Sequence, residues 1–329
     1  MNKNNLHMAE LPKLTKKQQE ILRLLYSFRF LNRIQIQAFL NHKDPKTINL
    51  WLRDLRAKGY AEWIYSTHFA EKTKPAIYYL GLNGVRHLRA LTRKNSDGDI
   101  LRAHPPEELR KRYKEPTRSQ VYIDRCILIA DCALALERQD IEDQAKGKKL
   151  RYYYQTEAGY LLERSYYHFV SDLDDTPIQP HLIFCRDRLD ENGKEEATIG
   201  SYILEVFDAT LPRYRMKKRL SDYVKFLDDE GDEWKEQTDT DKLPVILIVC
   251  PRTTDLIYAK RRTRKLIADA WYWESDDAEK PRMRFTTAEK MKEHGVLAKD
   301  IWEQASYVMS QNRNFHCLQW KLVSFSQEK

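Results

Sequence analysis

The sequence lacks the features of secreted and membrane-spanning proteins. Its five cysteines are an odd number without a CxxC pair, which favours reduced, buried thiols over a disulfide framework or a zinc site. The longest apolar runs, such as residues 244–251, are far too short to cross a bilayer. The first residues also lack the apolar core of a signal peptide. We therefore expect a cytoplasmic protein that has no membrane partner.

Several catalytic motifs are missing as well. The sequence contains no GxxxxGK[ST], GxSxG or GxGxxG pattern, so ATPase, serine hydrolase and dinucleotide-dependent activities have no support. None of the nine histidines forms the His-x-His pair that a rolling-circle nickase or relaxase of the usual type needs. Tyrosines are abundant, but we expect Tyr223 in a helix core. Those at 152–154 and 166–167 are expected in a sheet or stacked on bases.

Positive charge is concentrated in the N-terminal third. Residues 1–120 contain 24 Lys and Arg against 11 Asp and Glu, whereas residues 121–329 contain 33 against 38. Cations gathered on one module are what phosphate binding requires, because they release counterions condensed on DNA. A solubilising surface would give the same count, so charge alone does not decide.

Residues 15–91 read as three helices, a two-stranded hairpin and a fourth helix. This order is typical of a winged helix-turn-helix, a DNA-binding module, and we assign it to residues 1–91. Capping residues mark most of the helix ends. They are Thr15 with Gln18, Asn32, Asp44 with Pro45, Gly59 and Asn83.

The helix predicted at residues 45–58 has two opposed faces. Ile48, Trp51, Leu52 and Leu55 fall within an arc of roughly 100° that should face the core. The opposite side is basic and polar, and it can bond base edges and phosphates. An ordinary amphipathic helix is the alternative, but the flanking elements and the regional charge favour DNA. The predicted DNA-binding residues are Lys46, Thr47, Asn49, Arg53 and Arg56, with Lys72 and Lys74 on the wing tip.

Residues 92–118 form a polar, basic linker, and the pattern changes from residue 119 onward. A largely apolar helix is followed by strands and further helices. This order predicts a mixed α/β domain over 119–329, with a central sheet covered on both faces. The predicted helices are 121–137, 212–228 and 253–271, and the strands are 150–157, 161–170, 178–187, 199–208, 244–250 and 282–287.

The motifs also have a recognisable order. LTKKQQEILRLLYSFRFLNRIQIQAFL and YYLGLNG are followed by PHLIF…YILEVFDAT, KKRLSDYVKF, VILIVCP and RMRFTT, and then by Ile301-Trp302. Over roughly residues 14–302 the chain resembles the replication-relaxation family of plasmids and integrated mobile elements of bacteria. That resemblance implies a winged-helix head and a C-terminal domain similar to the PD-(D/E)XK nuclease fold.

The resemblance can be tested at the nuclease motif. Pro180-His181 stands in the Pro-Asp place and Glu205-Val206-Phe207 in the Glu-x-Lys place, so Glu205 is the one matching residue. An active site would need Glu205, Asp208 and Glu157 to hold Mg²⁺, with His181 assisting and Lys217 or Lys218 replacing the lysine. We therefore favour a non-catalytic domain of the same fold.

Three functions remain open. The first is a protein that binds double-stranded DNA in replication initiation, relaxation or mobilisation of a mobile element, with other such proteins as partners and a homodimer left open. The second is a Mg²⁺-dependent endonuclease or nickase that uses Glu205. The third is a winged-helix transcriptional regulator.

Overall fold

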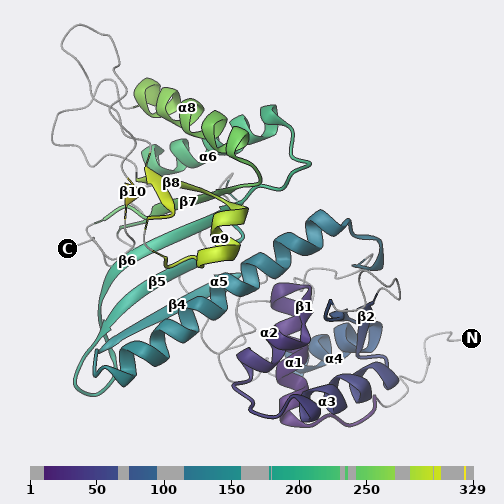
Figure 1. The fold of residues 1–329 in the computed structure, drawn as a ribbon. Coiled ribbons are helices and arrows are strands. Elements are labelled where there is room, and N and C mark those ends of the chain that lie inside the picture. The colour runs from purple at the N-terminus through teal and green to yellow at the C-terminus, as the bar shows by residue number, and fades with distance from the viewer. Residues whose placement is uncertain are drawn as a thin grey trace, which may run out of the picture. The chain divides into compact units, whose positions relative to one another are not determined.

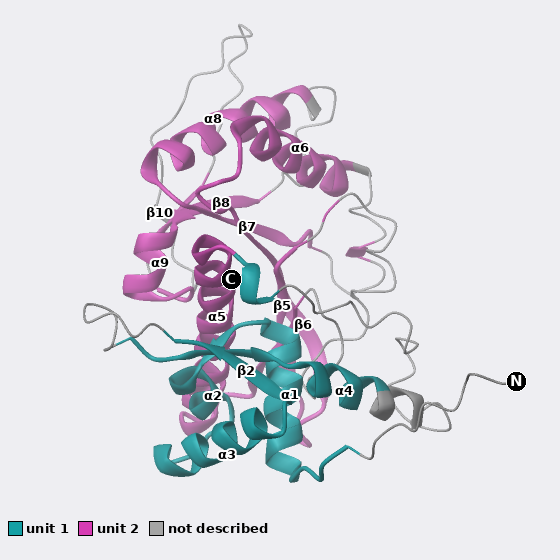
Figure 2. Ribbon diagram, turned by 90° about the vertical axis from the view of Figure 1, so that its right-hand side faces the viewer, with its two compact units in different colours: residues 1–118 teal, residues 119–329 magenta. Residues whose placement is uncertain are grey.

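The computed structural model describes residues 11–65, 74–94, 115–156, 178, 180–229, 234–235, 242–270, 282–298, 300–304 and 322–323. The chain divides into two compact units, residues 1–118 and 119–329 (Figure 2). The strand predicted at 161–170 and most of the predicted linker lie outside the described residues. Among the described residues, no helix is long and apolar enough to span a membrane.

Unit 1 has the predicted series of three helices, a hairpin and a fourth helix. A two-residue strand, too short for the sequence pattern to reveal, pairs with the hairpin and gives the antiparallel order β1-β3-β2. The elements are α1 (Lys16–Phe28), β1 (Leu31–Asn32), α2 (Arg33–Phe39), α3 (Pro45–Ala57), β2 (Ala61–Ile64), β3 (Ile77–Leu80) and α4 (Leu82–Lys94).

The helix ends follow the predicted capping residues with one exception. The Asp44 carboxylate accepts hydrogen bonds from the backbone N–H groups of Lys46 and Thr47, at 2.9 and 3.0 Å, and so begins α3. Asn83 was predicted to cap the fourth helix, and this was wrong, because α4 already begins at Leu82. The Asn83 amide instead donates to the Lys58 carbonyl at 2.8 Å, which satisfies the C-terminal end of α3.

Two glycines of the YYLGLNG motif, one just after β3 and one in the first turn of α4, allow the chain to pass closely against residues 59 and 60, which follow α3. A Cβ atom on Gly81 would lie 2.5 Å from the Gly59 carbonyl oxygen, and one on Gly84 would lie 2.4 Å from the Tyr60 carbonyl oxygen. Both distances are far shorter than a non-bonded contact allows. These glycines therefore allow the start of α4 to lie close to the end of α3.

The last residues of the predicted linker belong to unit 1. The 3₁₀ turn η2 (Glu115–Thr117) carries a buried carboxylate, whose two oxygens accept hydrogen bonds from Nε and Nη2 of Arg29 at 3.0 and 2.9 Å. Bidentate pairs of this kind are among the stronger side-chain interactions. Residues 115–117 are thus fastened to the end of α1.

Unit 2 is built on one seven-stranded mixed sheet of order β10-β9-β8-β7-β6-β5-β4. The pairs β6–β7 and β7–β8 are parallel, and the others are antiparallel. The strands are β4 (Leu150–Thr156), β5 (Leu182–Leu189), β6 (Glu195–Val206), β7 (Val245–Cys250), β8 (Met283–Thr287), β9 (Trp302–Gln304) and β10 (Leu322–Val323).

Helices cover both faces of this sheet, with α6 and α8 on one side and α5 and α9 on the other (Figure 1). The α6 and α8 side packs Leu220 and Tyr223 against alternate strand residues such as Ile203 and Ile248. Every residue of β7 is buried, as expected for a central strand. The helices are α5 (Gln120–Ala145), α6 (Arg213–Asp229), α8 (Thr253–Ala270) and α9 (Ala288–His294).

Helix α5 extends well past its predicted end at residue 137. The added turns bury two acidic side chains, Asp140 and Asp143, which apolar periodicity could not reveal. Asp140 accepts a hydrogen bond from the Tyr152 backbone N–H at 2.7 Å, and Asp143 pairs with Lys148 at 3.2 Å. The polar half of α5 is therefore held by contacts with the first strand and the turn before it.

Candidate nucleic-acid interface

Helix α3 is fixed in unit 1 by its apolar face. Ile48, Leu52 and Leu55 are fully buried, as their spacing predicted. Trp51 lies at the edge of this face, where its ring meets the His42 ring edge-on at 5.2 Å. Burial of large aliphatic side chains stabilises a helix by about 1.5–3 kcal/mol each. This packing fixes the orientation of α3 and so fixes which of its side chains face away from the core.

The opposite face of α3 presents polar and basic side chains to solvent. Lys46, Asn49 and Arg53 are exposed, and Leu50 beside them is also exposed. Thr47 differs from its predicted neighbours, because its hydroxyl donates to the Asp44 carboxylate at 2.6 Å. This hydrogen bond is the largest cause that lowers the pKa of Asp44. Thr47 thus serves the helix cap.

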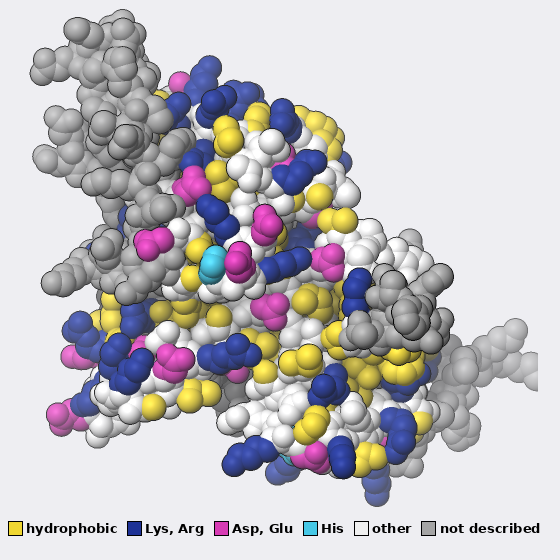
Figure 3. Space-filling model, in the orientation of Figure 1, with side chains coloured by type: hydrophobic (Ala, Val, Ile, Leu, Met, Phe, Trp, Pro, Cys, Tyr) yellow, Lys and Arg dark blue, Asp and Glu magenta, His cyan; other side chains and the backbone are white. Residues whose placement is uncertain are grey.

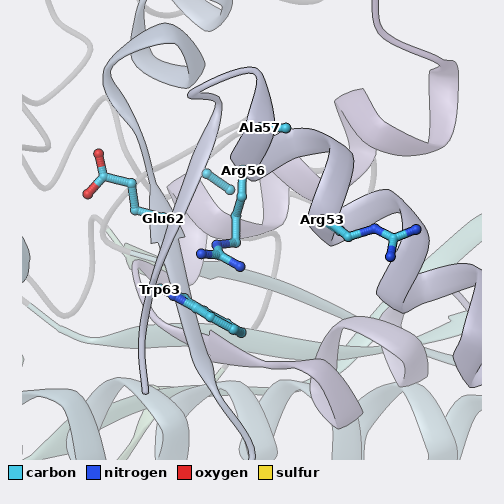
Figure 4. Close-up of a pocket in the computed structure, with 6 residues that line it drawn as sticks. Arg53, Arg56, Ala57, Glu62 and Trp63 are labelled. Atoms are coloured by element: carbon cyan, nitrogen blue, oxygen red, sulfur yellow. The ribbon is translucent and has the colours of Figure 1, made fainter. Parts of the chain in front are cut away.

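Arg56 lies against the hairpin rather than beside the other cations. Its guanidinium carbon is 3.5 Å from the centroid of the Trp63 ring, a close cation–π contact (Figure 4). Trp63 is 39% exposed and stacks on the Tyr65 ring at 5.4 Å. Neither aromatic residue was predicted from the sequence as part of this surface. Trp63 and Tyr65 stand two residues apart in an extended segment, so both side chains lie on the same side of it. Two such rings beside a basic helix were the sequence signal that could have identified them.

Two hollows flank α3. One, of about 430 Å³, is lined by Arg53 and Arg56 of α3 and by Glu62 and Trp63 of β2. The other, of about 750 Å³, lies toward the start of α1 and is lined by Leu50 and, again, Arg53. Because Arg53 borders both, it stands on a ridge between them. Figure 4 shows it projecting away from the Trp63 ring.

A polar network ties the last turns of α3 to α1. The Asp54 carboxylate accepts from the Gln18 amide at 2.7 Å and pairs with Lys58 at the same distance. The hydrogen bond from Lys58, followed by that from Gln18, lowers the pKa of Asp54.

Of the predicted wing-tip cations, Lys74 is exposed near the start of β3, and Lys72 lies outside the described residues.

In unit 2, the start of β5 and the end of β6 bring two residues of the nuclease motif together. His181 Nδ1 lies 3.5 Å from the Glu205 carboxylate and accepts a hydrogen bond from the Val206 backbone N–H at 3.1 Å. Glu205 is 1% exposed, pairs with the Arg219 guanidinium and accepts from the Tyr223 hydroxyl at 2.9 Å. The carboxylate is therefore already neutralised by a protein cation.

The remaining predicted residues do not join Glu205. Lys218 is 73% exposed and pairs with Asp222 at 3.0 Å, so the cation beside Glu205 comes from the next residue, Arg219. Asp208 pairs with Arg125 at 2.8 Å.

Glu157 lies outside the described residues. Within the described part of the chain, no three His, Cys, Asp or Glu side chains lie close enough to hold a metal ion. Because Mg²⁺ prefers several oxygen ligands, the described residues around Glu205 do not fit it.

No protein-family model and no curated protein sequence match this chain. Among solved structures, a mutant of ZitR from Lactococcus lactis is similar at 18% identity and a TM-score of 0.19, over 26% of this chain and 65% of ZitR. The restriction endonuclease FokI bound to DNA is similar at 11% identity and a TM-score of 0.25, over 86% of this chain and 45% of FokI. The chain spans less than two thirds of the length of either protein, and TM-scores this low do not establish a shared fold.

Proposed function

We propose that unit 1 is a winged helix-turn-helix module that binds double-stranded DNA. The observation that carries this proposal is the division of α3, whose apolar side is fully buried while Lys46, Asn49 and Arg53 face solvent. An α-helix with its side chains is roughly 10–12 Å wide, which suits a DNA major groove of about 12 Å. The hollows on both sides of α3 leave room for the groove walls.

The exposed side chains of α3 have chemistry suited to DNA. Asn49 can make two hydrogen bonds to adenine, and Arg53 can make two to guanine, while Lys46 suits a phosphate. Arg56 has a different role in this proposal. Because Trp63 holds its guanidinium at 3.5 Å, Arg56 is ordered before DNA arrives and contacts the backbone beside the groove.

In this proposal, unit 2 has a nuclease-like fold but does not cleave DNA. Its described elements run α5-β4-β5-β6-α6-β7, an order that supports the nuclease-like fold that the resemblance implies. The Arg219 guanidinium on Glu205 argues against metal-dependent cleavage. We place the protein in replication initiation, relaxation or mobilisation of a mobile element, a process that only the family resemblance supports.

Binding measurements on the full chain test the proposal. Lys46→Ala with Arg53→Ala removes two cations from α3, and Lys16→Ala with Arg86→Ala removes two exposed cations elsewhere in unit 1. With duplexes selected from a random pool, we expect the α3 pair to lose at least about tenfold in affinity and the control pair much less. Equal losses in both pairs would show that only net charge matters.

A transcriptional regulator would share the same head. Footprinting separates the two functions, because a regulator should protect DNA upstream of its own gene, whereas a replication or mobilisation protein should protect an origin-like site. Protection confined to promoter DNA would overturn the assignment to replication or mobilisation and leave DNA binding intact.

A further inference from the structure

Two helices of unit 2 carry a clear excess of cations over anions. Residues 119–329 contain 33 Lys and Arg against 38 Asp and Glu. Of these, α6 and α8 carry 11 cations and 5 anions, so the rest of the unit has 22 against 33. An otherwise acidic unit therefore carries one strongly basic pair of adjacent helices. Such separation of charge attracts polyanions.

Exposed cations and two tyrosines lie together on this helix pair. In α8, spacings of three and four residues place them on one side of the helix, and in α6 they are exposed on its first turns. Tyr258 is half-buried and also packs against the hydrophobic core. Figure 3 shows Lys and Arg side chains gathered over α6 and α8. We call this surface the basic helix face; it consists of Arg213, Tyr214, Lys217 and Lys218 of α6 and Tyr258, Arg261, Arg262 and Lys265 of α8.

Direct contacts join the two helices into one surface. The Tyr258 hydroxyl of α8 donates to the Arg213 carbonyl of α6 at 3.3 Å. The guanidinium carbons of Arg213 and Arg262 lie 5.2 and 5.9 Å from the Tyr258 ring centroid. One tyrosine ring is therefore shared by an arginine from each helix. The two sets of cations are thus parts of one continuous surface.

The aromatic rings decide between the ligands that a basic face could bind. Tyr214 is 68% exposed and lies among these cations, with the Arg215 guanidinium 6.0 Å from its ring centroid. A face that only keeps the protein soluble needs no exposed ring. Bases of a single strand stack on aromatic rings while Lys and Arg contact the phosphates. Two anions border this face: Asp222, which pairs with Lys218, and the exposed Asp269, four residues after Lys265.

We propose that the basic helix face is a second DNA-binding site, specific for single-stranded DNA and independent of α3. Tyr214 would stack on an unpaired base, and the cations of both helices would follow the phosphates on either side of it. Unit 2 would thus hold a strand whose bases are exposed, while unit 1 holds duplex. This inference does not depend on the role proposed for α3.

The test uses the full chain with Lys46→Glu and Arg53→Glu, which removes the α3 contribution. In this background, Lys217→Glu, Arg261→Glu and Lys265→Glu reverse three exposed cations of the basic helix face. The matched control, Lys146→Glu, Lys149→Glu and Lys194→Glu, makes the same charge change at exposed positions elsewhere in unit 2. Fluorescence anisotropy with a labelled oligothymidine and with a duplex of equal length measures affinity at several salt concentrations.

We expect the face variant to bind the oligothymidine at least about tenfold more weakly than the control, with a salt slope that falls by about two. Tyr214→Ala should weaken binding to the single strand and leave duplex binding unchanged. The inference would be overturned if the two triple variants lost the same affinity for the oligothymidine. It would also be overturned if the background protein with the altered α3 bound the duplex more tightly than the oligothymidine. If the α3 variants bind duplex as tightly as the wild type, the proposed role of α3 fails and this inference stands. Circular dichroism confirms folding, and Lys217→Gln, Arg261→Gln and Lys265→Gln replace a variant that unfolds.

Discussion

Substitution of Glu205 tests whether its buried carboxylate stabilises the fold or takes part in catalysis. It is 1% exposed and is bonded by Arg219 and by the Tyr223 hydroxyl. Glu205→Gln keeps the size and one acceptor oxygen but removes the charge. The structure therefore predicts that this variant loses stability, because the Arg219 guanidinium is left beside a neutral group.

The size of the loss follows from the exposure of the partner. Breaking a fully buried ion pair costs about 3–5 kcal/mol. Arg219 is 38% exposed and can turn toward water, so we expect about 2–3 kcal/mol for Glu205→Gln. Glu205→Ala also leaves the buried Tyr223 hydroxyl without an acceptor, which adds about 1–3 kcal/mol.

Urea denaturation of the full chain measures these losses, with the transitions of the two units fitted separately. A cycle of Glu205→Gln, Arg219→Gln and the double variant should give a coupling energy above about 1 kcal/mol. The reasoning is refuted if Glu205→Gln unfolds at the same urea concentration as wild type. It is also refuted if wild type cleaves DNA with Mg²⁺ and Glu205→Gln does not.

Three further predictions concern other parts of the molecule. Trp63→Ala removes the ring under Arg56, and we expect a loss of about 0.5–2 kcal/mol in duplex affinity by titration, whereas Trp63→Phe should retain most of it. Gly84→Ala should destabilise the protein by at least about 1 kcal/mol in thermal unfolding, because its methyl group would meet the Tyr60 carbonyl oxygen; unchanged melting would refute the close packing.

Burial raises the pKa of Asp187 to about 6, so the folded protein keeps this proton to higher pH than the unfolded chain and loses stability as pH rises from about 4 to 6. Asp187→Asn should not lose stability over this pH range. Above pH 6 its free energy of unfolding should therefore exceed that of the wild type by up to about 3 kcal/mol. Parallel pH profiles of the free energy of unfolding for the two proteins would contradict this.

Much of unit 1 could be predicted from local pattern. Capping by Asp44, the buried side of α3 and the break at Gly59 depend on residues a few positions apart, and these local preferences agree with the packing. The buried run of β7 was equally legible. The sequence by itself determined which side of α3 is apolar and where positive charge accumulates.

Only the tertiary structure decided which side chains meet. Arg219, rather than Lys218, reaches Glu205, because one step along a helix turns the side chain by about 100°. Asp208 is bonded by Arg125, which lies 83 positions earlier in the chain. Arg56 stacks on Trp63 rather than extending freely beside Arg53. Such pairings depend on how separate elements pack, and packing is set by the whole core rather than by the spacing within any one segment.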